Sequence, residues 1–308
     1  MKKSIFLAAS ALMISAAATS AVKKKVQPQK PAPTPGIELI DKCWHDLSIN
    51  EINRFPMHTD FFVFDHANEA LENDMTKSHN FLSLHGDWKF NWVENADQRP
   101  TDCFSVDYDD SQWKTMPVPG IWELNGYGDP EYVNVGFAWR GHFNQQAPNV
   151  PIKDNHVGTY RRTINIPTDW TGKQVVAHFG SVTSCIFLYV NGRFVGYSED
   201  SKVATEFDIT DYVKAGDNQI TFQVMRWCDG SWTEDQDFWR LSGVARDTYL
   251  FAREKNKSIV AVGRVDDNKN HKLLIDAFMN IADECPGWDV IIYGDGPSRA
   301  KLMNYISE

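Results

Sequence analysis

The stretch Cys185–Tyr197, CIFLYVNGRFVGY, decides the fold class of this chain. Two short runs rich in β-branched and aromatic residues flank the dipeptide Asn191-Gly192. That dipeptide is a strong signal for a tight turn between two antiparallel strands. The stretch therefore predicts a β-hairpin.

Further short β-rich runs lie on both sides of this hairpin at near-regular spacing, with turn residues between them. They cover residues 82–92, 159–166, 175–179, 206–209 and 219–227. Many short strands separated by turns are typical of a jelly roll or β-sandwich. We therefore predict a mainly β domain of this kind over residues 81–252, interrupted by long loops at 94–111 and 118–157.

The pattern changes at about residue 253. An apolar strand is predicted at 258–262, a helix with one apolar face follows Asn270 as its cap, a second strand covers 288–293, and a second helix covers 298–306. This order predicts a short βαβα fragment of a parallel α/β domain over residues 253–308. The abrupt join near 253–257 indicates a fusion of two unrelated sequences.

The N-terminal 80 residues are predicted to form three segments. Residues 1–21 combine two lysines, an apolar run and small residues, which is typical of a signal peptide. Residues 22–36 contain four Lys and four Pro and are predicted to be a linker. Residues 37–80 are predicted to be an extended strap on the larger domain. We therefore expect an exported protein, periplasmic or extracellular, without a membrane span.

The composition limits the classes of partner that this chain is expected to bind. The net charge of -10 disfavours nucleic acid, which requires basic patches. The 11 Trp residues suit a sugar-handling protein, because indole rings stack on sugars, but a Trp-rich β-sandwich core explains them equally well. The five cysteines are widely spaced and contain no CxxC, so we expect neither a zinc site nor a disulfide framework, with one disulfide left open. Cys185 and Cys228 are expected to be buried.

The stretch Arg226–Asp247, RWCDGSWTEDQDFWRLSGVARD, fits neither the helical nor the strand period. It contains three Trp and five acidic residues, and it is predicted to be a structured loop between strands. Such loops, held by a rigid scaffold, commonly carry binding residues. Glu234 and Asp235 are expected on a solvated face.

Several motifs occur in the same order as in one known family. They are Asn53-Arg54, Leu84-His-Gly-Asp-Trp-Lys-Phe90, Val118-Pro-Gly-Ile-Trp122, Gly126-Tyr-Gly-Asp-Pro-Glu-Tyr-Val-Asn134, Gly158-Thr-Tyr-Arg161, Leu188–Tyr197, Ser201, Glu206-Phe-Asp208 and Arg226–Asp247. Residues 50–252 thereby resemble the N-terminal sugar-binding jelly roll of family 2 glycoside hydrolases, and specifically of the large bacterial β-galactosidases.

The resemblance implies specific residue roles. Asn134 matches a sugar-contacting asparagine, and Asp237 matches an aspartate that binds a sodium ion and galactose hydroxyls. A hard cation prefers oxygen ligands, so a carboxylate suits this role. Trp239 and Arg240 are expected to support the loop. In the family a separate barrel supplies two catalytic glutamates and uses magnesium, and neither the glutamates nor the magnesium ligands are expected in this chain.

Residues 262–297 resemble a second family, the group 1 GT-B glycosyltransferases. The matching words are Val262-Gly-Arg264, Lys269–Ile275, Ala277-Phe278 and Trp288–Pro297. Arg264 and Lys269 match the pair that meets the nucleotide-sugar diphosphate, a role that suits two cations near a helix start. Because the acceptor domain and a downstream glutamate motif are missing, we interpret these residues as the vestige of a donor site.

Three functional hypotheses follow. The first is a truncated β-galactosidase-like protein, inactive alone, whose galactoside pocket is completed by a catalytic barrel or by a homo-oligomer. The second is a stand-alone, weak carbohydrate-binding module, and the third is a glycosyltransferase remnant. No catalytic residue is predicted in this chain, because no pair of acidic residues has the placement that glycoside hydrolysis requires.

Overall fold

The computed structural model describes residues 7–8, 11–15, 42–134, 136–137, 146–255, 257–285 and 288–307. It divides the chain into two units between Arg253 and Glu254, and the smaller unit also includes the first residues of the chain. The predicted linker at 22–36 lies outside the described residues.

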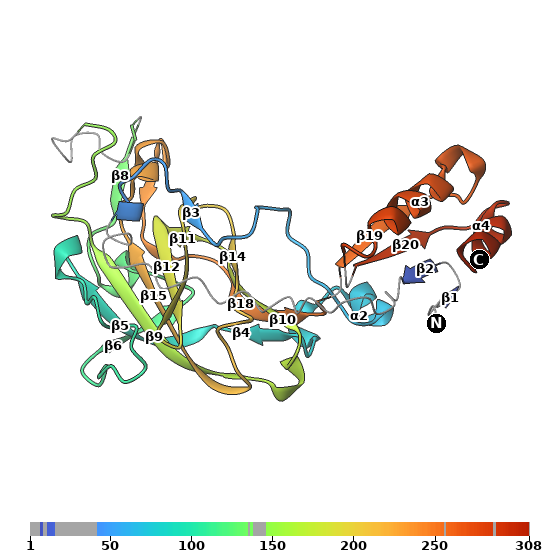
Figure 1. The fold of residues 1–308 in the computed structure, drawn as a ribbon. Helices are drawn as coiled ribbons and strands as arrows, with labels where there is room; N and C mark the ends of the chain where they lie inside the picture. Colours follow the sequence, from blue (N-terminus) through green and yellow to red (C-terminus); the bar gives the residue numbers. More distant parts are fainter. Residues whose placement is uncertain are drawn as a thin grey trace. The chain divides into compact units, whose positions relative to one another are not determined.

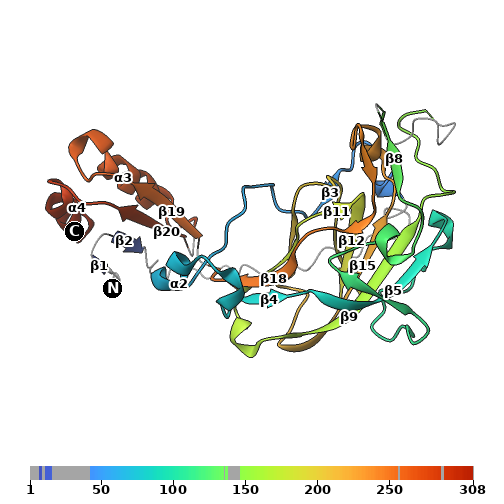
Figure 2. The same cartoon turned by 180° about the vertical axis from the view of Figure 1, so that it is seen from behind.

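Two antiparallel sheets build the larger unit. The seven-stranded sheet has the order β3 (Glu51–Ile52), β13 (Arg193–Ser198), β12 (Cys185–Val190), β15 (Gly216–Met225), β9 (Val157–Ile166), β5 (Gly86–Val93) and β6 (Lys114–Val118). The four-stranded sheet has the order β14 (Thr205–Asp208), β10 (Gln174–Phe179), β18 (Thr248–Arg253) and β4 (Phe81–Ser83). The long strands β15, β9 and β5 lie side by side (Figures 1 and 2). The predicted β-sandwich is confirmed.

Shorter elements complete this unit. The strands are β11 (Val182–Thr183), β17 (Gly243–Val244), β7 (Gly120–Ile121), β8 (Glu131–Val133) and β16 (Phe238–Arg240). The helices are α2 (Ala67–Glu72) and the 3-10 turns η1 (Met75–Lys77), η2 (Ala96–Gln98), η3 (Glu123–Asn125), η4 (Thr168–Trp170) and η5 (Asp229–Trp232).

The predicted hairpin is present. Strands β12 and β13 pair antiparallel, with Val190 opposite Arg193. The two turn residues have φ angles of 50° at Asn191 and 77° at Gly192. Two successive residues with positive φ match the twist that joins right-handed strands through a two-residue loop.

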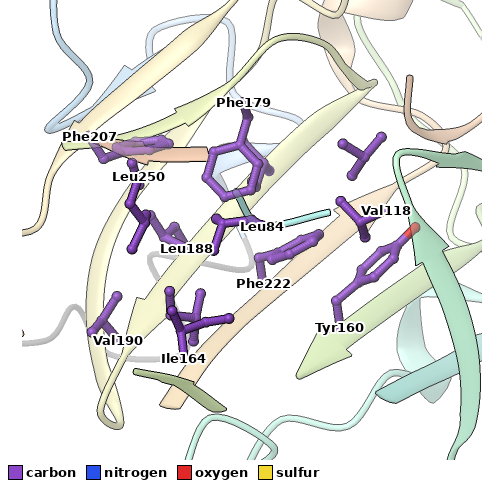
Figure 3. Close-up of a cluster of buried hydrophobic side chains, with 14 of the residues drawn as sticks. Leu84, Val118, Tyr160, Ile164, Phe179, Leu188, Val190, Phe207, Phe222 and Leu250 are labelled. Carbon is purple, nitrogen blue, oxygen red and sulfur yellow. The ribbon is translucent and has the colours of Figure 1, made fainter. Parts of the chain in front are cut away.

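The main core lies between the two sheets (Figure 3). It contains Phe179 and Leu250 from the smaller sheet and Leu188 and Phe222 from the larger sheet. The alternate residues of β12 point to the other face, where Phe187 and its neighbours join a second buried cluster with residues of the strap. A strand covered on both faces reads as a continuous apolar run, which explains the apolar sequence of β12.

Residues 42–80 are only partly extended. They contribute β3, which pairs with β13 at the edge of the larger sheet, but they also form the short helix α2. The predicted burial of Cys185 and Cys228 is confirmed. Cys103, Cys185, Cys228 and Cys285 are free thiols in the structure.

The smaller unit has the predicted βαβα order. It consists of β19 (Lys257–Val262), η6 (Asp267–Lys269), α3 (His271–Ile281), β20 (Trp288–Tyr293) and α4 (Arg299–Ser307), with β19 and β20 parallel. Asn270 occupies the N-cap position of α3 as predicted, although its side chain makes no capping hydrogen bond. Phe278, Val290 and Ile292 form part of the core.

The predicted signal segment contains two strands. The strand β2 (Ala11–Ser15) pairs antiparallel with β20, and β1 (Leu7–Ala8) pairs with β2. These two strands extend the sheet of the smaller unit to four. Among the described residues, no helix is long and apolar enough to cross a membrane.

Candidate functional site

A two-stranded ribbon formed by β8 and β16 positions the two predicted sugar-binding residues. Phe238 pairs with Val133, so the ladder ends immediately before Asn134 on one strand and Asp237 on the other. The Asp237 N–H donates to the carbonyl of Gly136, 3.1 Å away. The register therefore brings Asn134 and Asp237, which are remote in sequence, to the same end of one ribbon.

The carboxylate of Asp237 is exposed and oriented by a neighbour. The hydroxyl of Tyr132 donates to its Oδ1 at 2.8 Å. This hydrogen bond raises the pKa of Tyr132, because ionising the phenol would remove a donor beside a negative charge. Asp237 has a φ of 52°, a left-handed conformation that Asp and Asn tolerate better than most residues.

Exposed aromatic side chains surround this ribbon end. The exposed fractions are 51% for Tyr132, 45% for Phe137, and 49% each for Phe238 and Trp239. The rings of Tyr132 and Trp239 are 5.4 Å apart. Trp239, expected to support the loop, thus forms part of an apolar rim. Aromatic rings beside a few polar groups are typical of small-molecule sites.

The side chain of Arg240 links the segment that follows β8 to the segment that precedes β16. Its side chain is only 2% exposed. The guanidinium donates to the carbonyl of Gly136 at 3.1 Å and also to the carbonyl of Asp235. Burial lowers the pKa of Arg240, and the charges of Asp235 and Glu131 oppose that effect. This geometry fits the supporting role predicted for Arg240.

The expectation that Glu234 and Asp235 lie on a solvated face is wrong. The side chain of Asp235 is 12% exposed and forms an ion pair with Lys202 at 3.2 Å. Glu234 accepts hydrogen bonds from the backbone N–H and the hydroxyl of Ser201, at 3.0 and 2.6 Å. Both carboxylates therefore anchor the segment that precedes β16 to the loop that begins at Ser201.

A buried acidic cluster was not predicted from the sequence. Ligand-type atoms of Glu199, Cys228 and Asp229 lie within 4.8 Å of one another. Burial raises the pKa of Glu199 to about 10, and the neighbouring Cys228 adds to the shift. The Tyr197 hydroxyl donates to Glu199 at 2.7 Å. Burial therefore favours the protonated form of a carboxyl in this cluster over the carboxylate. The sequence signal was an acidic residue two positions after each of two β-rich runs.

In the smaller unit, Arg264 and Lys269 are both exposed. Arg264 forms an ion pair with Asp266, at 3.5 Å. A cavity of 430 Å³ lies between η6, α3 and α4, and its walls include Asp267, His271 and Lys301. Neither Arg264 nor Lys269 lines this cavity.

Comparisons with known proteins agree with both resemblances. Residues 81–254 match the family model of the glycosyl hydrolases family 2 sugar binding domain, and residues 249–308 match that of the glycosyl transferases group 1. A β-galactosidase of Priestia megaterium (strain DSM 319 / IMG 1521) is 42% identical over 204 residues, which cover 66% of this chain and 20% of that protein. A β-galactosidase of Streptococcus thermophilus is 38% identical over 288 residues, which cover 87% of this chain and 27% of that protein.

Among solved structures, a β-glucuronidase of Bacteroides uniformis matches with a TM-score of 0.44 and 22% identity, covering 58% of this chain and 18% of that chain. The chain thus spans about a fifth to a quarter of the length of the two curated relatives described above. The family model of the sugar binding domain covers more than half of the chain. We conclude that this chain belongs to glycosyl hydrolases family 2.

Proposed function

We propose that residues 81–252 supply one wall of a galactoside pocket in a β-galactosidase. Asn134 and Asp237 bind sugar hydroxyls there, and the aromatic rim contacts the apolar face of the sugar. The observation that carries this proposal is the β8–β16 register, which places both residues at one exposed ribbon end. The β-galactosidase relatives support the substrate class.

The chemistry of the ribbon end suits binding rather than hydrolysis. Retaining hydrolysis requires two carboxyl groups about 5–5.5 Å apart across the sugar. Near Asp237, the carboxylate of Asp235 is paired with Lys202, and that of Glu131 is paired with Arg226. The proposal therefore assigns hydrolysis to a barrel domain outside these 308 residues. The chain alone is expected to leave a chromogenic β-galactoside unhydrolysed.

The donor set at Asp237 fits a sodium ion in part. Within the described part of the chain, Oδ1 accepts from Tyr132, and Oδ2 and the second lone pair of Oδ1 remain for other partners. Carboxylate oxygens are the ligands that hard cations prefer, and such ions need several oxygens. Asp237 would therefore hold sodium together with sugar hydroxyls, water or groups of the barrel, and the ion would fix the orientation of a bound hydroxyl.

Titration of the labelled chain with galactose in sodium and in potassium buffer tests this function. We expect NMR shifts at residues 131–137 and 235–240 that are larger in sodium. Asp237→Asn keeps the left-handed backbone conformation and should abolish the sodium dependence. Asp169→Asn, at an exposed carboxylate in η4, is the matched control and should change nothing. Sodium-independent shifts, or none at saturating sugar, would count against the proposal.

The affinity for galactose distinguishes this proposal from the second hypothesis, a stand-alone binding module. Half a pocket makes fewer contacts to offset the cost of ordering the sugar, so we expect weak binding to the isolated chain and tighter binding when a barrel partner is added. Equal affinity with and without the partner favours the module.

The glycosyltransferase hypothesis rests on the match of residues 249–308. A rise in melting temperature with a UDP-sugar, lost in Arg264→Ala, would support it. The ion pair of Arg264 with Asp266 argues against a free phosphate-binding pair.

We also propose that the chain is exported, on the basis of its basic and apolar first 21 residues. The mass of the secreted protein tests this, because processing after Ala21 would remove β1 and β2.

A further inference from the structure

A second pocket lies between the strap and the four-stranded sheet, and Lys202, one of its lining residues, also pairs with Asp235 beside the β8–β16 ribbon. Its volume is about 810 Å³, which is within the range of small-molecule sites. Strap residues His58–Phe62 line one side, and His178 of β10, Glu206 of β14 and Tyr249 of β18 line the other. Among the described lining residues, none belongs to β8 or β16.

The floor of this pocket is held by a hydrogen-bonded group of three side chains. Glu206 binds Nε2 of His58 with one oxygen at 3.0 Å and Nδ1 of His178 with the other at 2.8 Å. The ring of His178 stacks on Tyr249, with centroids 4.3 Å apart. These contacts fasten the strap to the sheet, so the pocket is formed before any ligand arrives.

One wall carries an aromatic ring that the core does not use. Phe62 is half-buried and packs with Phe251, whereas its neighbour Phe61 is 55% exposed and lines the pocket. The ring of Phe61 is 4.8 Å from that of His58. An exposed aromatic face that lies beside polar groups suits a ligand with an apolar face and a polar rim.

The remaining polar groups offer both donors and acceptors. Asp60 is exposed, and its carboxylate forms no hydrogen bond with the described part of the chain. Arg246 uses one N–H to reach the carbonyl of Lys202 at 2.8 Å, which leaves further donors. The lining includes the carboxylates of Asp60, Glu206 and Asp247 and the cations Lys202 and Arg246. This balance disfavours strongly charged ligands and favours hydroxyl groups, which both donate and accept.

We propose that this pocket is a second carbohydrate site, which takes a neutral oligosaccharide. Phe61 stacks on a pyranose face, and Asp60 and Arg246 bind its hydroxyls. The site is independent of the ribbon end, because the two share no binding residue. It gives the domain a second point of attachment to a glycan, with binding residues other than Asn134 and Asp237.

NMR titrations of the labelled chain with lactose, cellotriose and maltotriose, and with glucuronate as a charged probe, test the proposal. We expect shifts at residues 58–64 and 246–249 for at least one neutral sugar and none for glucuronate. Phe61→Ala should weaken this binding about tenfold, while Phe61→Tyr should keep it, because both aromatic rings stack. Asp60→Asn should weaken it as well.

Asp237→Asn separates this site from the ribbon end. It should leave the shifts at 58–64 unchanged, whereas Phe61→Ala should leave the galactose shifts at 131–137 unchanged. Shifts confined to the ribbon, binding of glucuronate alone, unchanged affinity in Phe61→Ala, or no binding of any neutral sugar would each overturn the proposal. Failure of galactose to bind at the ribbon would contradict the proposed function and leave this site standing.

Discussion

Gly158 lies in β9 between two aromatic rings of the core. A Cβ atom at this position would clash with Trp122 and would lie 2.7 Å from the ring of Phe90. Overpacking of this kind costs about 1–3 kcal/mol. Because two rigid aromatic rings meet the added atom, we expect Gly158→Ala to lower the free energy of unfolding in urea titrations by about 3 kcal/mol or more, the upper end of this range.

Gly172→Ala is the matched control for that substitution. Its φ is 90°, but no atom lies within 4 Å of the added Cβ, so only backbone strain of about 1–2 kcal/mol is expected. Equal losses of stability at the two positions would contradict the steric role assigned to Gly158.

The buried carboxyl of Glu199 predicts a pH dependence of stability. Its folded-state pKa is raised to about 10, so the folded protein binds a proton that the unfolded chain releases above its ordinary value of 4.5. Stability from this group is therefore fully present below about pH 4.5 and is lost as the pH rises, by at most about 1.4 kcal/mol per pH unit.

Glu199→Gln removes this proton and keeps the shape of the side chain. We expect the melting temperature of Glu199→Gln, relative to that of the unchanged chain, to increase as the pH rises from 5 to 9. Asp169→Asn, at an exposed carboxylate, serves again as the control. A constant difference across that range would show that Glu199 is not protonated in the folded protein.

Some of the candidate functional residues can be recognised from the sequence, and others cannot. Asn134 and Asp237 can be recognised because the sequence motifs around them match a known family. Glu199 does not stand out, because its high pKa arises from burial beside Cys228 and Asp229, which come from a different strand end. An acidic residue after a β-run is otherwise most simply a surface residue.

At the scale of elements, Arg240 is expected to hold the β8–β16 ribbon together. Arg240→Met removes its hydrogen bonds to Gly136 and Asp235. The carbonyl of Gly136 keeps the N–H of Asp237, whereas the carbonyl of Asp235 loses this donor. A buried group left without its partner costs about 1–3 kcal/mol. We therefore expect amide exchange at residues 131–137 and 235–240 to rise by roughly tenfold or more.

Arg193→Met controls for the loss of an arginine elsewhere. Arg193 donates to the carbonyl of Asp211 and lies over Tyr212, outside the ribbon. Amide exchange of Arg193→Met at residues 131–137 and 235–240 should match that of the unchanged chain. Unchanged ribbon exchange in Arg240→Met would show that the backbone pairing alone holds the loop.

The sandwich strands were predictable because their apolar runs and turns are local. The ribbon was not, since 118–157 and 226–247 were both interpreted as loops. Each of β8 and β16 has three residues, too few to show a period. Their pairing depends on a partner remote in sequence, so only the folded chain reveals it. The helix α2 in the predicted extended strap was missed for the same reason, because it has six residues.

The whole molecule is expected to unfold in two steps. Each unit has its own core, with Phe222 in the larger unit and Ile292 in the smaller. We expect two transitions in scanning calorimetry. Ile292→Ala should lower only one of them, with a loss of about 2–5 kcal/mol, and Gly158→Ala should lower only the other. A single transition that both substitutions shift would contradict independent units.

The amino-acid sequence by itself determined the fold class, the change of character near residue 253 and the family. These depend on the period of apolar residues, on turn chemistry and on motif order, which are all local in the chain. The tertiary structure alone decided which polar side chains meet. It placed Asn134 and Asp237 at the same end of one ribbon, Glu199 near Asp229, and His58 of the strap against Glu206. Strand register and burial join such residues, and no local pattern connects them.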